Sequence, residues 1–132
     1  MEQKNAGYTI DSLVLVESSF TRENNINFHG EEIQTNLNVE NTNFENTEDG
    51  IIAVAVKATL LGIQNEKQVY SIACKYFGTF KKIGQPLLNE EDFKKINAPA
   101  IVFPFIREYI ANTALKAGLG NLLLPPVNFV NK

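Results

Sequence analysis

The chain has 132 residues, of which 44% are hydrophobic, and its twelve basic and fifteen acidic side chains give a net charge of −3. This length fits one domain with a real core, so we expect a single domain over residues 1–132. The acidic balance argues against nucleic-acid binding, because no excess of basic side chains is available to neutralise phosphates. The longest nearly uncharged stretch, Ala98–Ile106, has about half the length of a transmembrane helix, so no membrane span is expected.

The N-terminal residues and the cysteine count both indicate a cytoplasmic protein. Met1–Gly7 contains no apolar run of the kind that a secretory signal requires, and Cys74 has no partner for an internal disulfide. One cysteine and one histidine, His29, cannot make a zinc site by themselves. A Cys74–His29 nucleophile pair would require the two to meet in the fold, and nothing around either supports it. We expect no enzyme activity, no metal and no cofactor.

Four segments in the first two-thirds of the chain read as strands, namely 8–20, 33–39, 51–61 and 69–80. The third is apolar on nearly every residue, which predicts a central strand. A short hairpin loop at 62–67 joins it to the fourth. The connection at 21–32 is too long for a tight hairpin and predicts a crossover or a wrap around the sheet edge. Alternation places one set of first-strand side chains on a common face: Tyr8, Ile10, Val14, Val16 and Phe20.

Two helices are predicted after the strands. Asn89 can cap a short helix that ends near Ile96, with acids in its first turn and lysines near its end. A longer helix is expected from Pro99 to Gly118, because proline suits a first helical position and glycine a position just past the end. The apolar arc of this helix is wider than one sheet face requires. Two interpretations fit this arc equally: part of it packs on another subunit, or the helix is an ordinary core helix.

Two motifs lie close together in the last third of the chain. The first is Asn97-Ala98-Pro99-Ala100-Ile101-Val102-Phe103-Pro104-Phe105-Ile106-Arg107-Glu108, and the second is Leu122-Leu123-Leu124-Pro125-Pro126-Val127-Asn128-Phe129. Together they resemble the protein-export chaperone family SecB. In that family a Pro-x-x-x-x-Pro-aromatic-x-Arg-Glu helix start is followed, after a glycine, by a leucine-rich Pro-Val-Asn-Phe segment. The strand region agrees in order and length, and only loosely in sequence.

The resemblance implies an α+β fold: a four-stranded antiparallel sheet with a long C-terminal helix packed on one face. It implies a homo-oligomer, a dimer or tetramer, with the long helix at the tetramer interface. Its function would be ATP-independent holding of unfolded or precursor polypeptides in apolar grooves, in protein export. Phe28 and Phe44 stand out as contacts, because aromatics in polar loops have less core to occupy. The full set, each member of which also suits ordinary core packing, is Phe20, Phe28, Phe44, Tyr76, Phe77, Phe103, Leu122, Leu124 and Phe129.

Family members that deliver clients to the SecA motor use an acidic surface on the sheet strands. A loose alignment places Glu17 at one such position, which makes it the expected motor contact. Thr21 and Ala73 fall where other acids are expected. The printed sequence ends three residues after Phe129, where family members continue into a second helix and an acidic tail. The resemblance therefore names SecA as a partner, while these departures point away from the standard delivery route.

The sequence leaves two other functions beside holding, a dedicated adaptor as the alternative and an enzyme as the less favoured one. A SecB-like fold can serve as an adaptor or subunit for one dedicated partner, for example an antitoxin-type client. An enzyme with a similar layout, such as a thioesterase-like fold, would need a ligand tunnel that ends at a buried carboxylate, for example Glu108. Beside Arg107, that carboxylate is more simply one half of an ion pair at the helix start.

Overall fold

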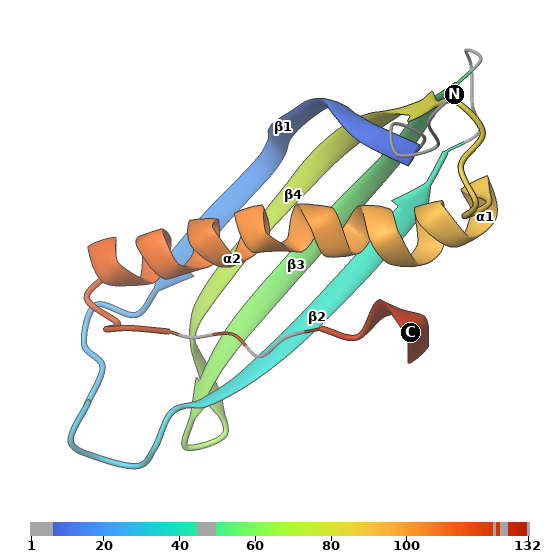
Figure 1. Cartoon of the computed structure of the whole chain (residues 1–132). Helices are drawn as coiled ribbons and strands as arrows, with labels where there is room; N and C mark the ends of the chain where they lie inside the picture. Colours follow the sequence, from blue (N-terminus) through green and yellow to red (C-terminus); the bar gives the residue numbers. More distant parts are fainter. Residues whose placement is uncertain (1–6, 45–49, 123, 125–126, 132) are drawn as a thin grey trace.

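The four predicted strands form one antiparallel sheet. The computed structural model describes residues 7–44, 50–122, 124 and 127–131. Its strands are β1 (Gly7–Arg22), β2 (Gln34–Asn43), β3 (Ile51–Gln64) and β4 (Lys67–Ile83), in the spatial order β1-β4-β3-β2 (Figure 1). A long C-terminal helix packs on one face, so the predicted fold is confirmed. Leu123, Pro125 and Pro126 of the second motif lie outside the described residues.

The sheet order explains the long connection after the first strand. β1 and β2 occupy opposite edges, so residues 23–33 cross the end of the sheet past β4 and β3 (Figure 1). We call this segment the crossover loop. Of the two alternatives that the sequence left open, the crossover is the one observed. The other three strands follow one another as a meander, with β3 in the interior, as its apolar sequence predicts.

The helical region is one continuous rod rather than two helices. It begins with α1 (Glu90–Asp92), where Asn89 Oδ1 accepts from the Asp92 amide at 2.8 Å, and passes through a π-helical turn, η1 (Phe93–Asn97), into α2 (Ala98–Lys116). The Ala98 amide donates to Phe93 O, five residues back, and Pro99 has no amide to continue the ordinary spacing. The rod ends as predicted at Gly118, whose φ is +73°.

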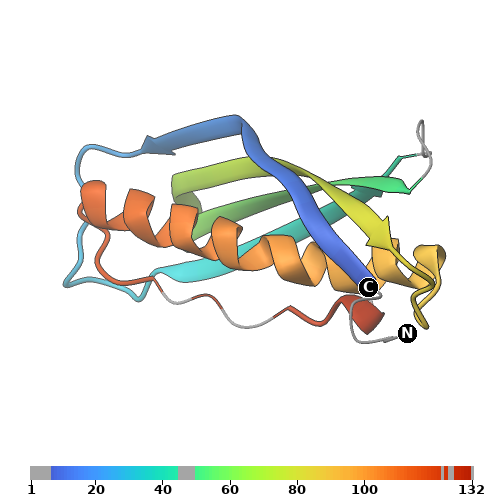
Figure 2. The same cartoon turned by 45° about the horizontal axis from the view of Figure 1, so that its top comes forward.

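The core lies between α2 and one side of the sheet, which we call the helix side. Even-numbered residues of β3 and, beyond the register shift at Val69, of β4 point to it, and odd-numbered residues point to the opposite side. α2 leaves that opposite side uncovered, and we call it the open side (Figure 2). Because β3 is interior and α2 covers β4 and β3, this side of β3 is fully buried. The facing side chains that α2 contributes are Val102, Ile106, Ile110 and Ala114.

Two β-bulges overturn the predicted face of the middle of the first strand, and Phe20, beyond the second bulge, returns to the side of Tyr8 and Ile10. The register of β1 against β4 shifts at Asp11 and again at Val16. Each bulge adds one residue and so exchanges the two faces. Val14 therefore lies opposite Phe77 on the open side, and not with Tyr8 and Ile10 as alternation predicts.

The β3–β4 hairpin is tighter than the predicted loop at 62–67. The strands run on to Gln64 and Lys67, and only Asn65 and Glu66 form the turn, with φ of 55° and 63°. Positive φ at both central residues is the type I′ geometry, whose twist matches that of the strands. Gly62 thus belongs to a strand.

Candidate functional site

The helix leaves most of β1 uncovered on the helix side. Ile10, Leu15 and Phe20 of β1, with Ile101 and Phe105 of α2, are each 37–45% exposed. Between them, the Tyr76 ring packs against Phe105 with centroids 6.4 Å apart. We call these five exposed side chains the β1–α2 strip. It matches the expectation that the apolar arc of the long helix exceeds what one sheet face needs.

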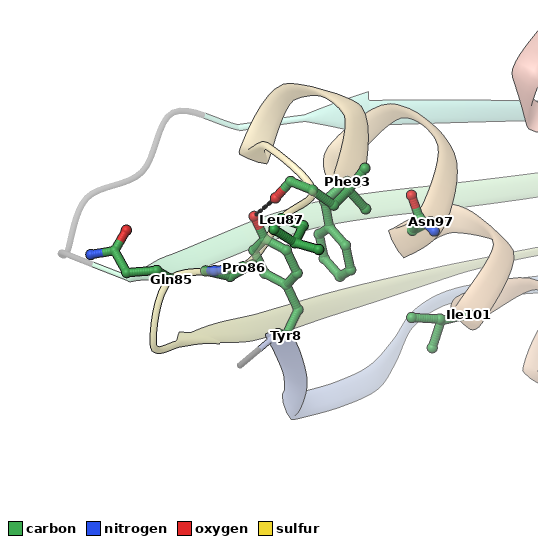
Figure 3. Close-up of a pocket in the computed structure, with 9 residues that line it drawn as sticks. Tyr8, Gln85, Pro86, Leu87, Phe93, Asn97 and Ile101 are labelled. Carbon is green, nitrogen blue, oxygen red and sulfur yellow. Dashed lines mark hydrogen bonds between the residues drawn. The ribbon is translucent and has the colours of Figure 1, made fainter. Parts of the chain in front are cut away.

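An apolar pocket of about 410 Å³ opens at the α1 end of this strip, and we call it the end pocket (Figure 3). Tyr8 and Phe93 stack with ring centroids 4.0 Å apart, and Tyr8 Oη donates to Leu88 O at 2.7 Å. Burial, and then the Glu90 carboxylate, raise the pKa of Tyr8, which keeps this phenol a neutral donor. Leu87 is fully exposed beside the stacked rings. The lining is Gly7, Tyr8, Gln85, Pro86, Leu87, Leu88, Phe93, Asn97 and Ile101.

A second pocket, of about 420 Å³, lies across η1 from the first and beside β2, and we call it the β2 pocket. Asn41 Nδ2 donates to Lys94 O at 3.2 Å, while Asn41 Oδ1 is buried with no hydrogen-bond partner among the described residues. Its lining is more polar than that of the end pocket: Val39, Asn41, Asn43, Lys95, Ile96, Phe129 and Val130. The turn η1 therefore has a pocket on each flank.

The crossover loop presents one large aromatic to solvent. Phe28 is 50% exposed, and the guanidinium carbon of Arg22 lies 5.9 Å from its ring centroid. His29 follows it and is exposed as well. Neither residue contributes to the core, which agrees with the prediction that an aromatic in this polar loop has little core to occupy.

The open side of the sheet carries charges of both signs. Glu17 lies between two lysines, with its carboxylate oxygens 3.6 Å from Lys57 Nζ and 3.7 Å from Lys75 Nζ. Asp11 pairs with Lys81 at 3.5 Å. Between these two groups of charges along β4, the rings of Phe44 and Phe77 meet edge to face, with centroids 5.6 Å apart.

The structure distributes the predicted contact residues over several surfaces instead of one groove. Phe20 and Tyr76 lie at the β1–α2 strip, Phe28 on the crossover loop, and Phe44 with Phe77 on the open side. The remaining four lie beneath or beside α2. Phe103 and Phe129 are 3% and 7% exposed and pack against each other, while Leu122 and Leu124 are partly buried against the core.

The sequence reasoning missed the end pocket. Leu87 and Leu88 lie in a polar linker between β4 and α1, so the argument that singled out Phe28 applied to them too. Tyr8, Phe93 and Ile101 could not be found in this way, because each reads as a core residue of its own element. Only the β1–β4 pairing, between residues far apart in the chain, brings Tyr8 to Phe93.

The residues considered for catalysis do not assemble into a site. Cys74 is fully buried, and burial raises its pKa to about 12, so the thiol stays protonated and unreactive. Glu108 is exposed and accepts a hydrogen bond from Asn112, and none of the ion pairs among the described residues joins it to Arg107. In the part of the chain that the structure describes, no three metal-ligating side chains cluster, and no helix is long and apolar enough to cross a membrane.

Comparisons with known proteins agree with the sequence motifs. Residues 2–131 match the family SecB, described as preprotein translocase subunit SecB. A protein-export protein SecB of Halorhodospira halophila is 38% identical over 85 residues, which are 64% of this chain and 47% of that protein. The SecB of Nitrobacter winogradskyi is 30% identical over 99 residues, 75% of this chain and 59% of its own. The chain thus spans about half the length of the curated relatives that it matches.

Solved structures share the fold. A SecB-like chaperone of Mycobacterium tuberculosis, in complex with a ChAD peptide from the HigA1 antitoxin, aligns with a TM-score of 0.76 and 14% identity, over 92% of this chain and 91% of that one. A protein of unknown function from Streptococcus agalactiae aligns with a TM-score of 0.53 and 10% identity, over 91% and 98%. At these identities the likeness concerns the fold alone.

Proposed function

Because this chain belongs to the SecB family of chaperones, we propose that it holds unfolded or precursor polypeptides without ATP, in protein export. The activity requires adaptable apolar surface and no reacting group. We place it in the cytoplasm, where the lone thiol of Cys74 stays reduced.

The observation that carries this proposal is the end pocket. It combines a fully exposed Leu87 with the stacked rings of Tyr8 and Phe93, in a volume that accepts one large apolar side chain of a client. An exposed apolar site of this kind on a soluble chain typically marks a binding surface. The exposed Phe28 and the β2 pocket provide further contacts for an extended segment of a client. The proposed binding surface is therefore spread over several shallow sites and is not one deep cavity.

Titration of a permanently unfolded, carboxymethylated protein tests the proposal. The natural chain should bind it without nucleotide. Leu87→Ser should weaken binding about threefold to tenfold, because roughly 2 kcal/mol of apolar burial is at stake and only part of it is lost. Leu115→Ser is the matched control, since Leu115 is exposed on the last turns of α2, away from both pockets. Absence of binding by the natural chain would refute the holding function.

Self-assembly is the second part of the proposal. β1 is an edge strand whose outer backbone is unpaired, and it carries exposed aliphatic side chains at Ile10, Val14 and Val16. The other edge, β2, is dominated by asparagine and threonine. A long edge strand with exposed aliphatic side chains is prone to pair with another strand, and β2 lacks such side chains on its exposed positions. We propose a dimer or tetramer in which β1 and the exposed side of α2 meet other copies.

Delivery of clients to the SecA motor is the most specific part of the role that the family suggests. The open side carries Asp11, Glu17 and Glu40 on its strands, and the lysines at 57, 75 and 81 balance them. Glu17, the expected motor contact, is already paired with two of these lysines, whose positive charges offset the charge of its carboxylate. We propose that any contact between SecA and Glu17 is weak for this reason.

A dedicated partner is the alternative function. The Mycobacterium tuberculosis structure shows a SecB-like chaperone with an antitoxin peptide, and this fold matches nearly the whole of the present chain. The charge balance around Glu17 favours the same alternative, because the two lysines offset the negative charge that delivery to SecA uses. Co-purification of one stoichiometric partner, together with indifference to generic unfolded proteins, would select this function over general holding.

A further inference from the structure

We propose that Arg22 and Gln64 are positioning residues that hold the crossover loop so that Phe28 stays exposed to a client. The inference rests on the proposed holding function for its purpose, whereas its structural part stands on the hydrogen bonds of the loop. The two residues belong to different strands, the end of β1 and the end of β3, and both bind main-chain carbonyls of the loop.

The crossover loop has little apolar anchoring of its own. It crosses the end of the sheet, and its partly buried side chains are only Ile26 and Ile33. One backbone bond ties its start to the sheet, from the Glu23 amide to Val69 O at 2.8 Å. Side chains from outside the loop must therefore supply most of its remaining order.

Gln64 fixes the middle of the loop. Its side chain is 7% exposed, and Nε2 donates to Asn27 O at 2.8 Å and to Glu31 O at 2.7 Å. Asn27 in turn starts a tight turn, since its carbonyl accepts from the Gly30 amide and its Oδ1 accepts from the His29 amide. Phe28 lies inside this turn, so Gln64 holds the carbonyls on both sides of the aromatic.

Arg22 fixes the start of the loop and ties it to the helix. Its guanidinium donates to Glu23 O at 2.7 Å, to Asn24 O at 3.1 Å and to Ala117 O at 2.5 Å. Ala117 is the C-cap of α2, directly after its last residue, and the helix dipole favours a cation at this end. None of the ion pairs among the described residues includes Arg22, so carbonyls and the Phe28 ring are its partners.

The arrangement gives Phe28 a fixed position before a client arrives. A flexible loop loses conformational entropy when a client orders it, which weakens binding. A loop that is already ordered in the free chain loses less entropy on binding. Because Arg22 donates to both α2 and the loop, it also sets the distance between Phe28 and the end of the helix. We therefore expect changes at Arg22 and Gln64 to alter loop order and client affinity together.

Hydrogen exchange of residues 24–33 in the full chain provides the first test. Gln64→Met removes both bonds and keeps the length of the side chain, and it should speed exchange about tenfold. Gln68→Met is the matched control, because Gln68 is exposed in the same hairpin. Arg22→Lys keeps the charge but cannot reach three carbonyls, so it should also speed exchange, whereas Arg107→Lys should not.

Fluorescence and affinity provide the second test. The chain has no tryptophan, so Phe28→Trp introduces a unique probe. On that background, Gln64→Met and Arg22→Lys should change acrylamide quenching of Trp emission and weaken binding of the carboxymethylated protein about fivefold. Unchanged exchange and quenching would overturn the proposal, as would faster exchange with unaltered affinity. If the natural chain binds no client, the holding function fails, and exchange still decides whether these residues order the loop.

Discussion

The ring of Tyr70 lies over Gly62 of the neighbouring strand, so closely that a Cβ at position 62 would stand 2.1 Å from Tyr70 Cε2. The absence of a side chain at Gly62 thus lets Tyr70, which is almost fully buried, close the core next to the crossover loop.

Gly62→Ala should destabilise the chain by about 2 kcal/mol, because the ring must leave its position to admit the methyl group. Chemical denaturation measures the loss. Gly78→Ala is the control, since a Cβ there meets its neighbours at 3.4 Å or more, an ordinary contact. The loss should shrink in a Tyr70→Leu background. An equal loss with and without the Tyr70 ring would contradict this explanation.

The Cys74 thiol should make stability depend on pH in the alkaline range. In the folded chain its pKa is raised to about 12 by burial, while the unfolded thiol has an ordinary value of 9.0. Above pH 9 the unfolded state therefore binds fewer protons than the folded state, and raising the pH favours unfolding. This residue alone should lower the free energy of unfolding by about 1.4 kcal/mol per pH unit between these values.

The comparison with Cys74→Ala isolates this contribution from other titrating groups. The quantity to follow is the free energy of unfolding of the natural chain minus that of the variant. Whatever the value of this difference at pH 8, it should fall as the pH rises from 9 towards 10.5. A constant difference across that range would show that Cys74 is not shielded as described. Thiol reagents at pH 8 should likewise react with the unfolded chain and leave the folded chain unmodified.

The proposed assembly through β1 predicts a specific effect on native mass. Val16→Lys places a charge on the exposed edge and should lower the mass of the particle in solution, measured by light scattering or native mass spectrometry. Asn38→Lys makes the corresponding change on β2 and should leave the mass unchanged. Loss of assembly with the β2 variant, and not with the β1 variant, would show that the interface lies at β2 and would contradict the proposal.

The balance of charges around Glu17 predicts how SecA binding responds to substitution. Lys57→Gln with Lys75→Gln leaves Glu17 unpaired and should strengthen binding to SecA about fivefold at low salt. Adding Glu17→Gln should remove that gain. The individual pairs are partly exposed and contribute little to stability, so folding should be nearly unaffected. If the lysine substitutions leave SecA binding unchanged, Glu17 is not a motor contact.

The fold could be predicted from the sequence wherever the signal is local. The continuous apolar run of β3, the Asn89 cap and the Gly118 helix end are each confirmed, because they depend on residues within one turn or one strand. The face of β1 was predicted wrongly only between the two bulges, at Val14 and Val16, whereas Phe20 lies on the same side as Tyr8 and Ile10, as predicted. A bulge arises from pairing with another strand, so alternation within a single strand contains no sign of it.

In the candidate site, too, features that depend on neighbouring residues could be predicted and features that depend on distant residues could not. The exposure of Phe28 follows from its polar neighbours in the chain, and the structure agrees with it. The end pocket required Tyr8 and Phe93 to meet, and the loop anchors required Gln64 to meet Asn27. These contacts join segments that are distant in sequence, and the composition of each segment gives no indication of its partner.

Suppression of aggregation is the sharpest test of the proposed holding function. A chemically denatured client is diluted with the purified chain, without nucleotide, and light scattering is followed as the ratio of chain to client rises. We expect suppression at near-stoichiometric ratios, unaffected by ATP, and reduced in Leu87→Ser but not in Leu115→Ser. Scattering that stays unchanged at every ratio, together with no binding of an unfolded protein, would contradict the holding function.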